Sequence, residues 1–350
     1  NINFDCGESG LGIRMFTPLL ALNPHEISIS GKGSLQKRPL HFFEQSLTQL
    51  GKFVATNNGF VPIKLKNVLV QKSITIDGSE SSQYLTGLLM LWAFLKNTRH
   101  CIYVNNLQSK PYIDLTLQIL SEFGYSFENQ NYQLFRLNGY DVERIAKTIR
   151  YTNESDWSGS AFLIVLACFF NHITICELTL NSVQADKAIL TCLDLAGIKY
   201  QINSQNVFQI ISVDNAQGFH FDASDCPDLF PPLVSLASKL SSPSKIKGVH
   251  RLTHKESNRA LTLQQEFAKI NVGIDFQNDE MIITPPKNPT NISKIVNFES
   301  HYDHRIAMAV AVAGIGFGIQ FTIQNAEAVN KSYPLFFEDI KKVGVEMDEL

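Results

Sequence analysis

The stretch ITIDGSESSQYLTGLLMLWAF, residues 74–94, combines a short strand pattern, an acid at the strand end, a tight polar turn and an apolar helix. Four more stretches have the same order, at 2–22, 151–170, 219–238 and 296–314. The acids that end the strands lie 72, 77, 68 and 77 residues apart and are Asp5, Asp77, Glu154, Asp222 and Glu299. A near-constant period of this size indicates a structural repeat.

A second helix and a hairpin follow these starts, most clearly at 115–137, 189–211 and 261–284. In each of these stretches apolar residues alternate on both sides of a polar turn, as expected for paired strands. The repeating unit is therefore expected to run strand–helix–strand–helix–strand–strand over about 70 residues. Such a unit belongs to the α/β class.

The number of repeats predicts two domains, because 350 residues are more than one core usually holds. Residues 1–152 would form one domain with two units, and residues 153–350 a second domain with three. The last unit ends with the stretch 336–347, which contains a helix pattern and one strand pattern, where the other units have two strand patterns after the helix. Because the chain also begins inside a strand pattern, we expect a sixth unit and the completing strand to precede residue 1.

The composition excludes several classes of protein. A formal net charge of −3 with scattered Lys and Arg gives no basic footprint for nucleic acid or for a membrane surface. No signal peptide or bilayer-spanning apolar run is visible. The cysteines form no CxxC pair and several lie in apolar runs, which is typical of buried thiols in a reducing cytoplasm. We expect a cytoplasmic monomer that acts on small molecules.

The helix starts predict an anion site. A helix N-terminus has unpaired N–H groups and a positive dipole end, and these starts contain hydroxyls and small residues, as in Ser9-Gly10, Ser81-Ser82-Gln83 and Ser158-Gly159-Ser160. For a single start, an ordinary N-cap explains the serine equally well. Several cations also lie beside a Gly, a Pro or a helix start: Arg14, Arg38, Lys255, Arg259, Arg305 and Lys331. Together they predict a small ligand with several negative charges.

Two acids near these cations are candidates for proton transfer. Asp228 opens a helix between prolines, and Glu256 lies between Lys255 and Arg259. A carboxylate held among cations suits general acid–base catalysis, although a helix cap or a dipole partner is compatible with the same positions. The pair His301 and His304 is too weak a pattern to predict a metal, and we expect none.

Five motifs resemble the 5-enolpyruvylshikimate-3-phosphate synthase family, in order along nearly the whole chain. They are SSQYLTGLLM (81–90), QSKPYIDLTL (108–117), HKESNR (254–259), YDHRIAM (302–308) and NKSYP (330–334). The resemblance implies two domains of three βαβαββ units each that close over a cleft, an inside-out α/β fold of which five units are present here. It also implies transfer of an enolpyruvyl group from phosphoenolpyruvate to the 5-hydroxyl of shikimate 3-phosphate, on the route to chorismate and aromatic amino acids. No metal or organic cofactor is implied.

The resemblance assigns roles to residues whose positions match the motifs. The contacts of shikimate 3-phosphate would be Ser81, Ser82, Gln83, Ser109, Tyr112, Asp228 and Lys255. The clamp on phosphoenolpyruvate would be Arg38, Arg259, Arg305 and Lys331, with Gly10 and Arg14 at the first helix start. The proton-transfer groups would be Asp228, Glu256 and Lys331, with His304 beside them.

The chain departs from the family pattern in three places, one of which is Arg251, where some members carry Asn. Glu8 and Leu11 stand where the family usually has Asn and Thr. The N-terminal Lys-Ser substrate motif of the family has no counterpart, so we expect this 350-residue chain alone to be impaired. Two alternatives remain from the sequence: a transferase that acts on UDP-N-acetylglucosamine, and a scaffold of the same fold without catalysis. The segment GKGSLQKRP (31–39) lacks the Cys typical of the first, and the intact acids and cations argue against the second.

Overall fold

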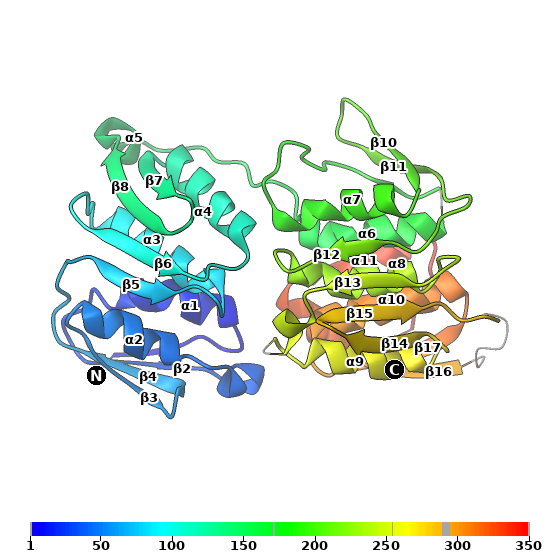
Figure 1. Cartoon of the computed structure of the whole chain (residues 1–350), viewed down its shortest axis with the longest axis horizontal. Coiled ribbons are helices and arrows are strands. Elements are labelled where there is room, and N and C mark those ends of the chain that lie inside the picture. Colours follow the sequence, from blue (N-terminus) through cyan, green and yellow to red (C-terminus); the bar gives the residue numbers. More distant parts are fainter. Residues whose placement is uncertain (1, 171, 254, 289–294, 349–350) are drawn as a thin grey trace. The chain divides into compact units, whose positions relative to one another are not determined.

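The computed structural model describes residues 2–170, 172–253, 255–288 and 295–348. His254 of the HKESNR motif is outside these residues. The chain divides into two compact units, Asn1–Thr152 and Asn153–Leu350 (Figure 1). Each unit has α-helices and β-sheets and belongs to the α/β class, as the repeat predicts.

The first unit contains two complete βαβαββ repeats, which confirms the repeat pattern. The first repeat consists of β1 (Ile2–Asp5), α1 (Gly10–Leu20), β2 (Ile27–Ser30), a 3₁₀ turn η1 (Gly33–Lys37), α2 (His41–Gln49), β3 (Phe53–Asn57) and β4 (Phe60–Lys66). The second repeat consists of β5 (Ile74–Asp77), α3 (Ser82–Phe94), β6 (Cys101–Asn105), α4 (Lys110–Glu122), β7 (Tyr125–Gln130) and β8 (Leu134–Tyr140), and a short α5 (Val142–Ala146) follows. The two sheets have the same strand order, β1-β2-β4-β3 and β5-β6-β8-β7, with one parallel pair in each.

The second unit contains one repeat of the same kind and two that differ from it. The complete repeat consists of β12 (His220–Asp222), η3 (Pro227–Leu229), α8 (Phe230–Ala237), β13 (Ser244–Lys247), η4 (Val249–Leu252), α9 (Arg259–Ala268), β14 (Gly273–Gln277) and β15 (Glu280–Thr284). Before it come α6 (Trp157–Phe169), β9 (Thr174–Ile175), η2 (Ala185–Ala188), α7 (Ile189–Leu195), β10 (Lys199–Ile202) and β11 (Phe208–Ser212). After it come β16 (Ile295–Glu299), α10 (His304–Phe317), β17 (Gln320–Gln324), η6 (Ala326–Lys331) and α11 (Phe336–Lys342).

Two expected strands are absent from the described residues. Residues 151–156 form no strand, so Glu154 ends none. Side-chain bonds hold this segment instead, because Gln184 Nε2 donates to Glu154 Oε2 at 3.1 Å and to the Ser155 carbonyl at 2.8 Å. Residues 343–348, after α11, also form no strand, although the sequence pattern predicts one there. A strand needs a neighbour for its backbone groups, and no neighbouring strand pairs with either segment.

The other four strand-end acids build the turn that leads into each helix. Each carboxylate accepts a hydrogen bond from the backbone N–H two residues later, at 2.7–3.0 Å: Asp5 from Gly7, Asp77 from Ser79, Asp222 from Ser224 and Glu299 from His301. Asp and Asn favour such turns because a short polar side chain reaches its own backbone. The acids that mark the repeat therefore have a structural role.

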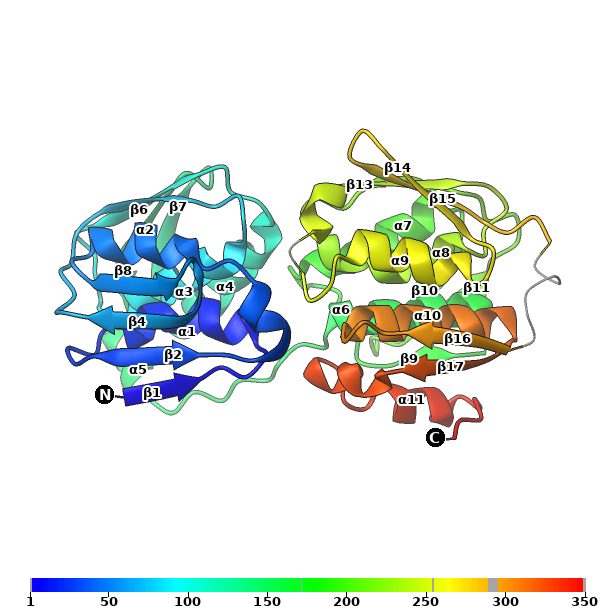
Figure 2. The ribbon, with the colours of Figure 1, turned by 90° about the horizontal axis from the view of Figure 1, so that it is seen from below.

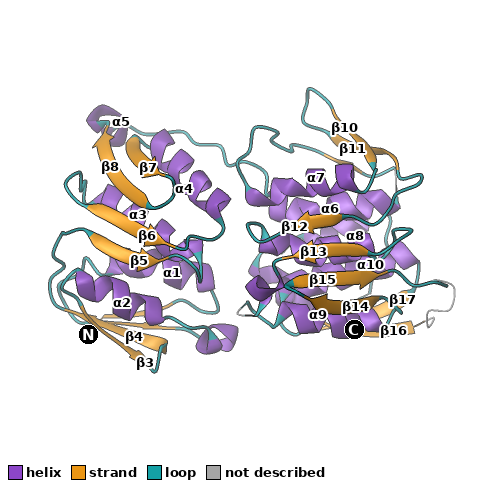
Figure 3. Ribbon diagram, in the orientation of Figure 1, coloured by secondary structure: helices purple, strands orange, loops and turns teal. Residues whose placement is uncertain are grey.

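Apolar helices form the interior of each unit, and the sheets cover them. Strands such as β5 and β13 alternate between buried and exposed residues, so one face of each sheet packs on helices and the other faces solvent (Figure 3). Helix α10 buries twelve of its fourteen residues. In Figure 2, α9 and α10 lie between the sheet that contains β14 and the β16–β17 pair. The first residues of α1, α3, α6, α9 and α10 are buried, whereas those of α2, α4 and α5 are exposed.

Close packing of α1 on α3 gives a first testable expectation. A Cβ added at Gly87 in α3 would lie 2.7 Å from the Met15 carbonyl and 2.8 Å from the Arg14 carbonyl. We expect Gly87→Ala to lower the free energy of unfolding by about 1–3 kcal/mol through overpacking, although alanine favours helices. Gly139→Ala, where an added Cβ meets nothing within 4 Å, is the control for a urea titration. Equal stability of the two variants would contradict the packing argument.

Candidate active site

Asp303 organises the cluster of charges in the second unit. Its Oδ1 caps α10 by accepting from the Arg305 backbone N–H at 3.0 Å. The same carboxylate accepts from Arg259 Nε at 2.7 Å and from Arg259 Nη2 at 3.2 Å. Asp303 is fully buried, which would raise its pKa, but the Arg259 guanidinium outweighs burial and lowers the pKa to about 2. Asp303 is therefore ionised and fixes the position of Arg259.

Asp228 lies among three cations. Arg259 Nη1 is 2.8 Å from Asp228 Oδ1, Lys255 Nζ is 3.3 Å from the same oxygen, and Arg305 Nη2 is 3.2 Å from Oδ2. Burial disfavours the carboxylate, but Arg305, Lys255 and Arg259 hold the pKa of Asp228 well below its usual range. The structure thus brings together four residues that the sequence singles out, from η3, α9, α10 and the segment before α9.

Glu256 and His304 form a second polar pair beside this cluster. His304 Nδ1 is 2.8 Å from Glu256 Oε2, and His304 is buried at the first position of α10. Burial raises the pKa of Glu256, but the hydrogen bond to His304 and the charge of Arg259 leave it lower than usual. A carboxylate bonded to an imidazole can pass a proton in either direction.

Lys331 is the exposed member of the set. It ends η6, and its Nζ donates to the Tyr302 carbonyl at 2.8 Å, next to the Asp303 cap. The sequence places it 26 residues after Arg305, and the structure brings it to the start of the same helix.

In the first unit, the predicted substrate residues gather at the starts of α3 and α4. Ser81 caps α3 by accepting from the Gln83 backbone N–H at 3.3 Å, and Ser82 is buried. Ser109 precedes α4 with a left-handed backbone (φ 55°) and is buried. Thr116 connects these starts, because its hydroxyl contacts Thr86 at 2.8 Å and donates to the Tyr112 carbonyl.

Arg14 and Arg38 lie at the first helix start in different environments. Arg14 is 3% exposed; its Nη1 donates to Gln83 Oε1 at 3.3 Å, its Nη2 lies 3.7 Å from Glu80, and its guanidinium stacks over Tyr84. These contacts position Gln83, and direct contact of Arg14 with substrate stays a prediction. Arg38 lies against Gly10, where an added Cβ would be 2.1 Å from Nη1.

Glu8, one of the departures from the family pattern, contacts η1. Its Oε2 accepts from the Ser34 backbone N–H at 3.4 Å and from the Ser34 hydroxyl at 3.5 Å. The carboxyl group lies against Gly33, where an added Cβ would come within 2.3 Å of it. Glu8 therefore stabilises η1, the turn that directly precedes Arg38. Leu11 is exposed on α1.

The sequence motifs assign no substrate or proton-transfer role to three residues of this cluster. Asp303 adjoins two predicted residues, and its position directly before a helix is the signal of an N-cap that could have identified it. Ser158 and Asp186 bond each other, and Ser158 also accepts from Arg305 Nη2 at 2.8 Å. Asp186 had no local signal, because it reaches the cluster only through the packing of η2 on α6.

Among the described residues, one group of three metal-type ligands lies within 4.8 Å: Glu256, Asp303 and His304. Asp303 is already bonded to Arg259, whose charge repels a cation.

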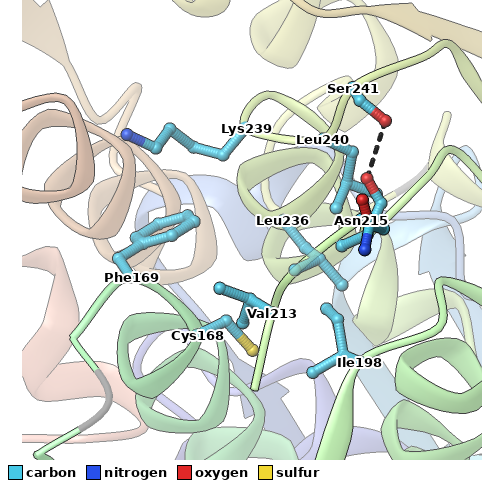
Figure 4. A pocket seen from close by; sticks show the side chains of 10 residues that line it. Cys168, Phe169, Ile198, Val213, Asn215, Leu236, Lys239, Leu240 and Ser241 are labelled. Carbon is cyan, nitrogen blue, oxygen red and sulfur yellow. Dashed lines mark hydrogen bonds between the residues drawn. The ribbon is translucent and has the colours of Figure 1, made fainter.

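A separate hollow of about 400 Å³ lies at the other end of α6 and α8 and is lined by residues such as Cys168, Leu236 and Lys239 (Figure 4). It brings together no acid–base pair.

None of the helices in the described parts of the chain is long and apolar enough to cross a membrane.

Repeated βαβαββ units with cations and acids at the helix starts define a protein of the enolpyruvyl transferase fold. Solved structures share this fold: an EPSP synthase from Acinetobacter baumannii has a TM-score of 0.71 at 21% identity, over 99% of this chain and 80% of that chain. The enolpyruvyl transferase NikO from Streptomyces tendae has a TM-score of 0.68 at 13% identity, over 94% of this chain and 75% of that chain.

The chain belongs to the EPSP synthase (3-phosphoshikimate 1-carboxyvinyltransferase) family, whose sequence model matches residues 1–340. A relative from Clostridium novyi, named 3-phosphoshikimate 1-carboxyvinyltransferase, is 33% identical over 100% of this chain and 78% of its own length. A relative of the same name from Clostridium botulinum is 32% identical over 98% of this chain and 78% of its own length. The family resemblance of the sequence motifs is thereby confirmed.

Proposed function

We propose that the protein transfers the enolpyruvyl group of phosphoenolpyruvate to the 5-hydroxyl of shikimate 3-phosphate and releases phosphate. The observation that carries the proposal is the partly buried cluster in which Asp228 contacts Arg259, Arg305 and Lys255, with the Glu256–His304 pair beside it. Cations of this kind bind phosphate and carboxylate, and the acids supply proton transfer. The names of the relatives support the same reaction.

The chemistry proceeds by addition and elimination. A proton is added to the methylene carbon of phosphoenolpyruvate, and C2 becomes electrophilic. The 5-hydroxyl oxygen bonds to C2 and loses its proton. The bond from C2 to the phosphate oxygen then breaks, and the new methyl group gives back a proton to restore the double bond. Asp228, Glu256, Lys331 and His304 are the proposed proton-transfer groups, and the arginines stabilise the charge that moves to phosphate.

Substrate contacts divide between two sets of residues. Ser81, Ser82, Gln83, Ser109 and Tyr112, with Asp228 and Lys255, are proposed to bind shikimate 3-phosphate. Arg38, Arg259, Arg305 and Lys331 are proposed to bind phosphoenolpyruvate, with Gly10 leaving room for Arg38. We further propose a cytoplasmic monomer that needs no cofactor and binds neither nucleic acid nor membrane, consistent with the net charge of −3.

Reaction in D₂O tests this sequence of steps. The intermediate has a methyl group that can rotate, so the product recovered from shikimate 3-phosphate should contain deuterium in its vinyl group, as measured by proton NMR and mass spectrometry. UDP-N-acetylglucosamine is the competing acceptor. Carboxyvinyl transfer to that acceptor and not to shikimate 3-phosphate would refute the assignment.

The Gly10 position gives a prediction for phosphoenolpyruvate binding. Because a Cβ at Gly10 would overlap the Arg38 guanidinium, Gly10→Ala should displace Arg38. We expect KM for phosphoenolpyruvate to rise about tenfold, the equivalent of one charge-assisted hydrogen bond, with little change in KM for shikimate 3-phosphate. Leu11→Ala, at an exposed position of the same helix, is the control. Unchanged kinetics in Gly10→Ala would argue against Arg38 as part of the clamp.

Lys255 predicts a limit at high pH. Burial lowers its pKa to about 8, so the ammonium loses its proton as the pH rises through that value. Because the charged form is the one that binds an anion, kcat/KM for shikimate 3-phosphate should fall above about pH 8. Lys255→Arg should shift this fall to higher pH, since guanidinium stays charged. An identical alkaline limit in both proteins would assign it to another group.

A further inference from the structure

Ser158 is not the cap of its helix, although it lies at a helix start rich in serine. Both oxygens of Asp156 cap α6 instead, by accepting from the backbone N–H groups of Ser158 at 2.9 Å and Gly159 at 3.1 Å. The Ser158 hydroxyl is therefore available for other partners. It donates its proton to Asp186 Oδ2 and accepts from Arg305 Nη2 at 2.8 Å. Because Asp156 already caps α6, the Ser158 hydroxyl bonds to Asp186 and Arg305 instead of to the helix backbone.

A hydroxyl has one proton, so the identity of the acceptor sets its orientation. With the proton directed at Asp186, the oxygen lone pairs of Ser158 face Arg305. Asp186 lies on η2, which packs on α6, and is 3% exposed. The carboxylate therefore holds the Ser158 hydroxyl in the one orientation that accepts from a guanidinium.

Arg305 is held from two sides by this arrangement. Besides Ser158, its Nη2 lies 3.2 Å from Asp228 Oδ2, and its Nη1 donates to the Asp228 carbonyl at 3.4 Å. A long Arg side chain loses considerable rotamer freedom when it is fixed, so anchors made before substrate arrives lower the cost of binding an anion. Asp186 acts on the same guanidinium as Asp228, but through a hydroxyl.

We propose that Ser158 and Asp186 are positioning residues that orient Arg305 for the phosphate of phosphoenolpyruvate. The inference rests on the proposed function, and neither residue needs to touch substrate. Burial and the neighbouring Asp228 raise the pKa of Asp186 to about 6, offset in part by Arg305. The charged groups around Asp186 are Asp228, Arg305 and Asp156. A proton gained by Asp186 would supply a competing donor and release the orientation of Ser158.

The test variants are Ser158→Ala and Asp186→Asn. The controls are Ser160→Ala, which replaces another serine of α6, and Asp275→Asn, which replaces an exposed acid. We expect KM for phosphoenolpyruvate to rise about tenfold in the first two variants, as for one lost hydrogen bond to a charged group. KM for shikimate 3-phosphate should stay unchanged, and Asp186→Glu should recover part of the loss. Equal changes in both KM values, or a change in unfolding alone, would overturn the inference.

A pH profile separates positioning from a purely structural role. KM for phosphoenolpyruvate is measured across pH in Asp186→Asn and in wild type, and the ratio of the two values is taken. Ionisation of the substrate affects both proteins equally and cancels in this ratio. As the pH falls through about 6, wild type should lose its advantage and the ratio should approach one. A ratio that is constant across this range would contradict a role for the charge of Asp186.

A binding measurement separates failure of the inference from failure of the proposed function. If wild type releases no phosphate from the two substrates, the proposed function fails. Calorimetry with inorganic phosphate then tests the anion site alone. Tighter binding by wild type and Ser160→Ala than by Ser158→Ala would support the positioning role, and equal binding, or none by wild type, would overturn it.

Discussion

Replacing Asp228 with asparagine should lower kcat by about 10²–10⁴-fold, the usual contribution of a positioned general acid–base group. The substitution removes the proposed proton-transfer group and also the counter-charge of Arg259, Arg305 and Lys255. The amide keeps the shape of the side chain, so the fold should survive. The measurement is kcat at saturating concentrations of both substrates, with the urea midpoint recorded for the same samples.

Asp275→Asn is the matched control, because Asp275 is an exposed acid on β14 in the same unit. It should leave kcat and stability unchanged. If Asp228→Asn kept kcat within a factor of about three of wild type, Asp228 would have no role in the transition state.

Replacing Arg259 with methionine should give the largest loss of stability. Arg259 is 3% exposed and joins Asp303, which is fully buried, to Asp228. Removal of one partner from a buried ion pair leaves an unpaired charge and costs about 3–5 kcal/mol of unfolding free energy. The urea midpoint should therefore fall, and binding of phosphoenolpyruvate should be lost.

The double variant Arg259→Met with Asp303→Asn tests the reason for this loss. Removing the second charge should restore part of the unfolding free energy, because no uncompensated charge remains. Arg99→Met, at an exposed arginine, controls for the substitution itself. A double variant less stable than the sum of both single changes would show that packing, and not charge, dominates the effect.

Local signals account for the parts of the fold that the sequence predicts. The strand-end acids bond to the backbone two residues later, as Asp77 does to Ser79. Helices α1, α3, α6 and α10 begin with a Ser or Asp cap that bonds within three residues, as Ser81 does to Gln83. The strand expected at 151–156 fails because a strand depends on a partner elsewhere in the chain, which Gln184 replaces with side-chain bonds. Sequence alone cannot show which segment satisfies a backbone.

The candidate site likewise contains residues that local motifs identify and residues that only tertiary packing brings in. Motif residues such as Asp228, Lys255, Arg259 and Arg305 come together as expected. Arg14 shows the limit of that reasoning, because the sequence gives a cation at a helix start but not its contacts with Gln83, Glu80 and Tyr84. Contact of Arg14 with substrate stays a prediction. Asp186 joins the cluster through tertiary packing, which no spacing in the sequence records.

The most direct test of the account is phosphate release from phosphoenolpyruvate with shikimate 3-phosphate as acceptor, compared between wild type and Asp228→Asn. Omission of the acceptor gives the background rate, and UDP-N-acetylglucosamine replaces it in a parallel series. We expect wild type to release phosphate only when shikimate 3-phosphate is present, and Asp228→Asn to release almost none. Binding of both substrates without phosphate release by wild type, or equal release by the two proteins, would contradict it.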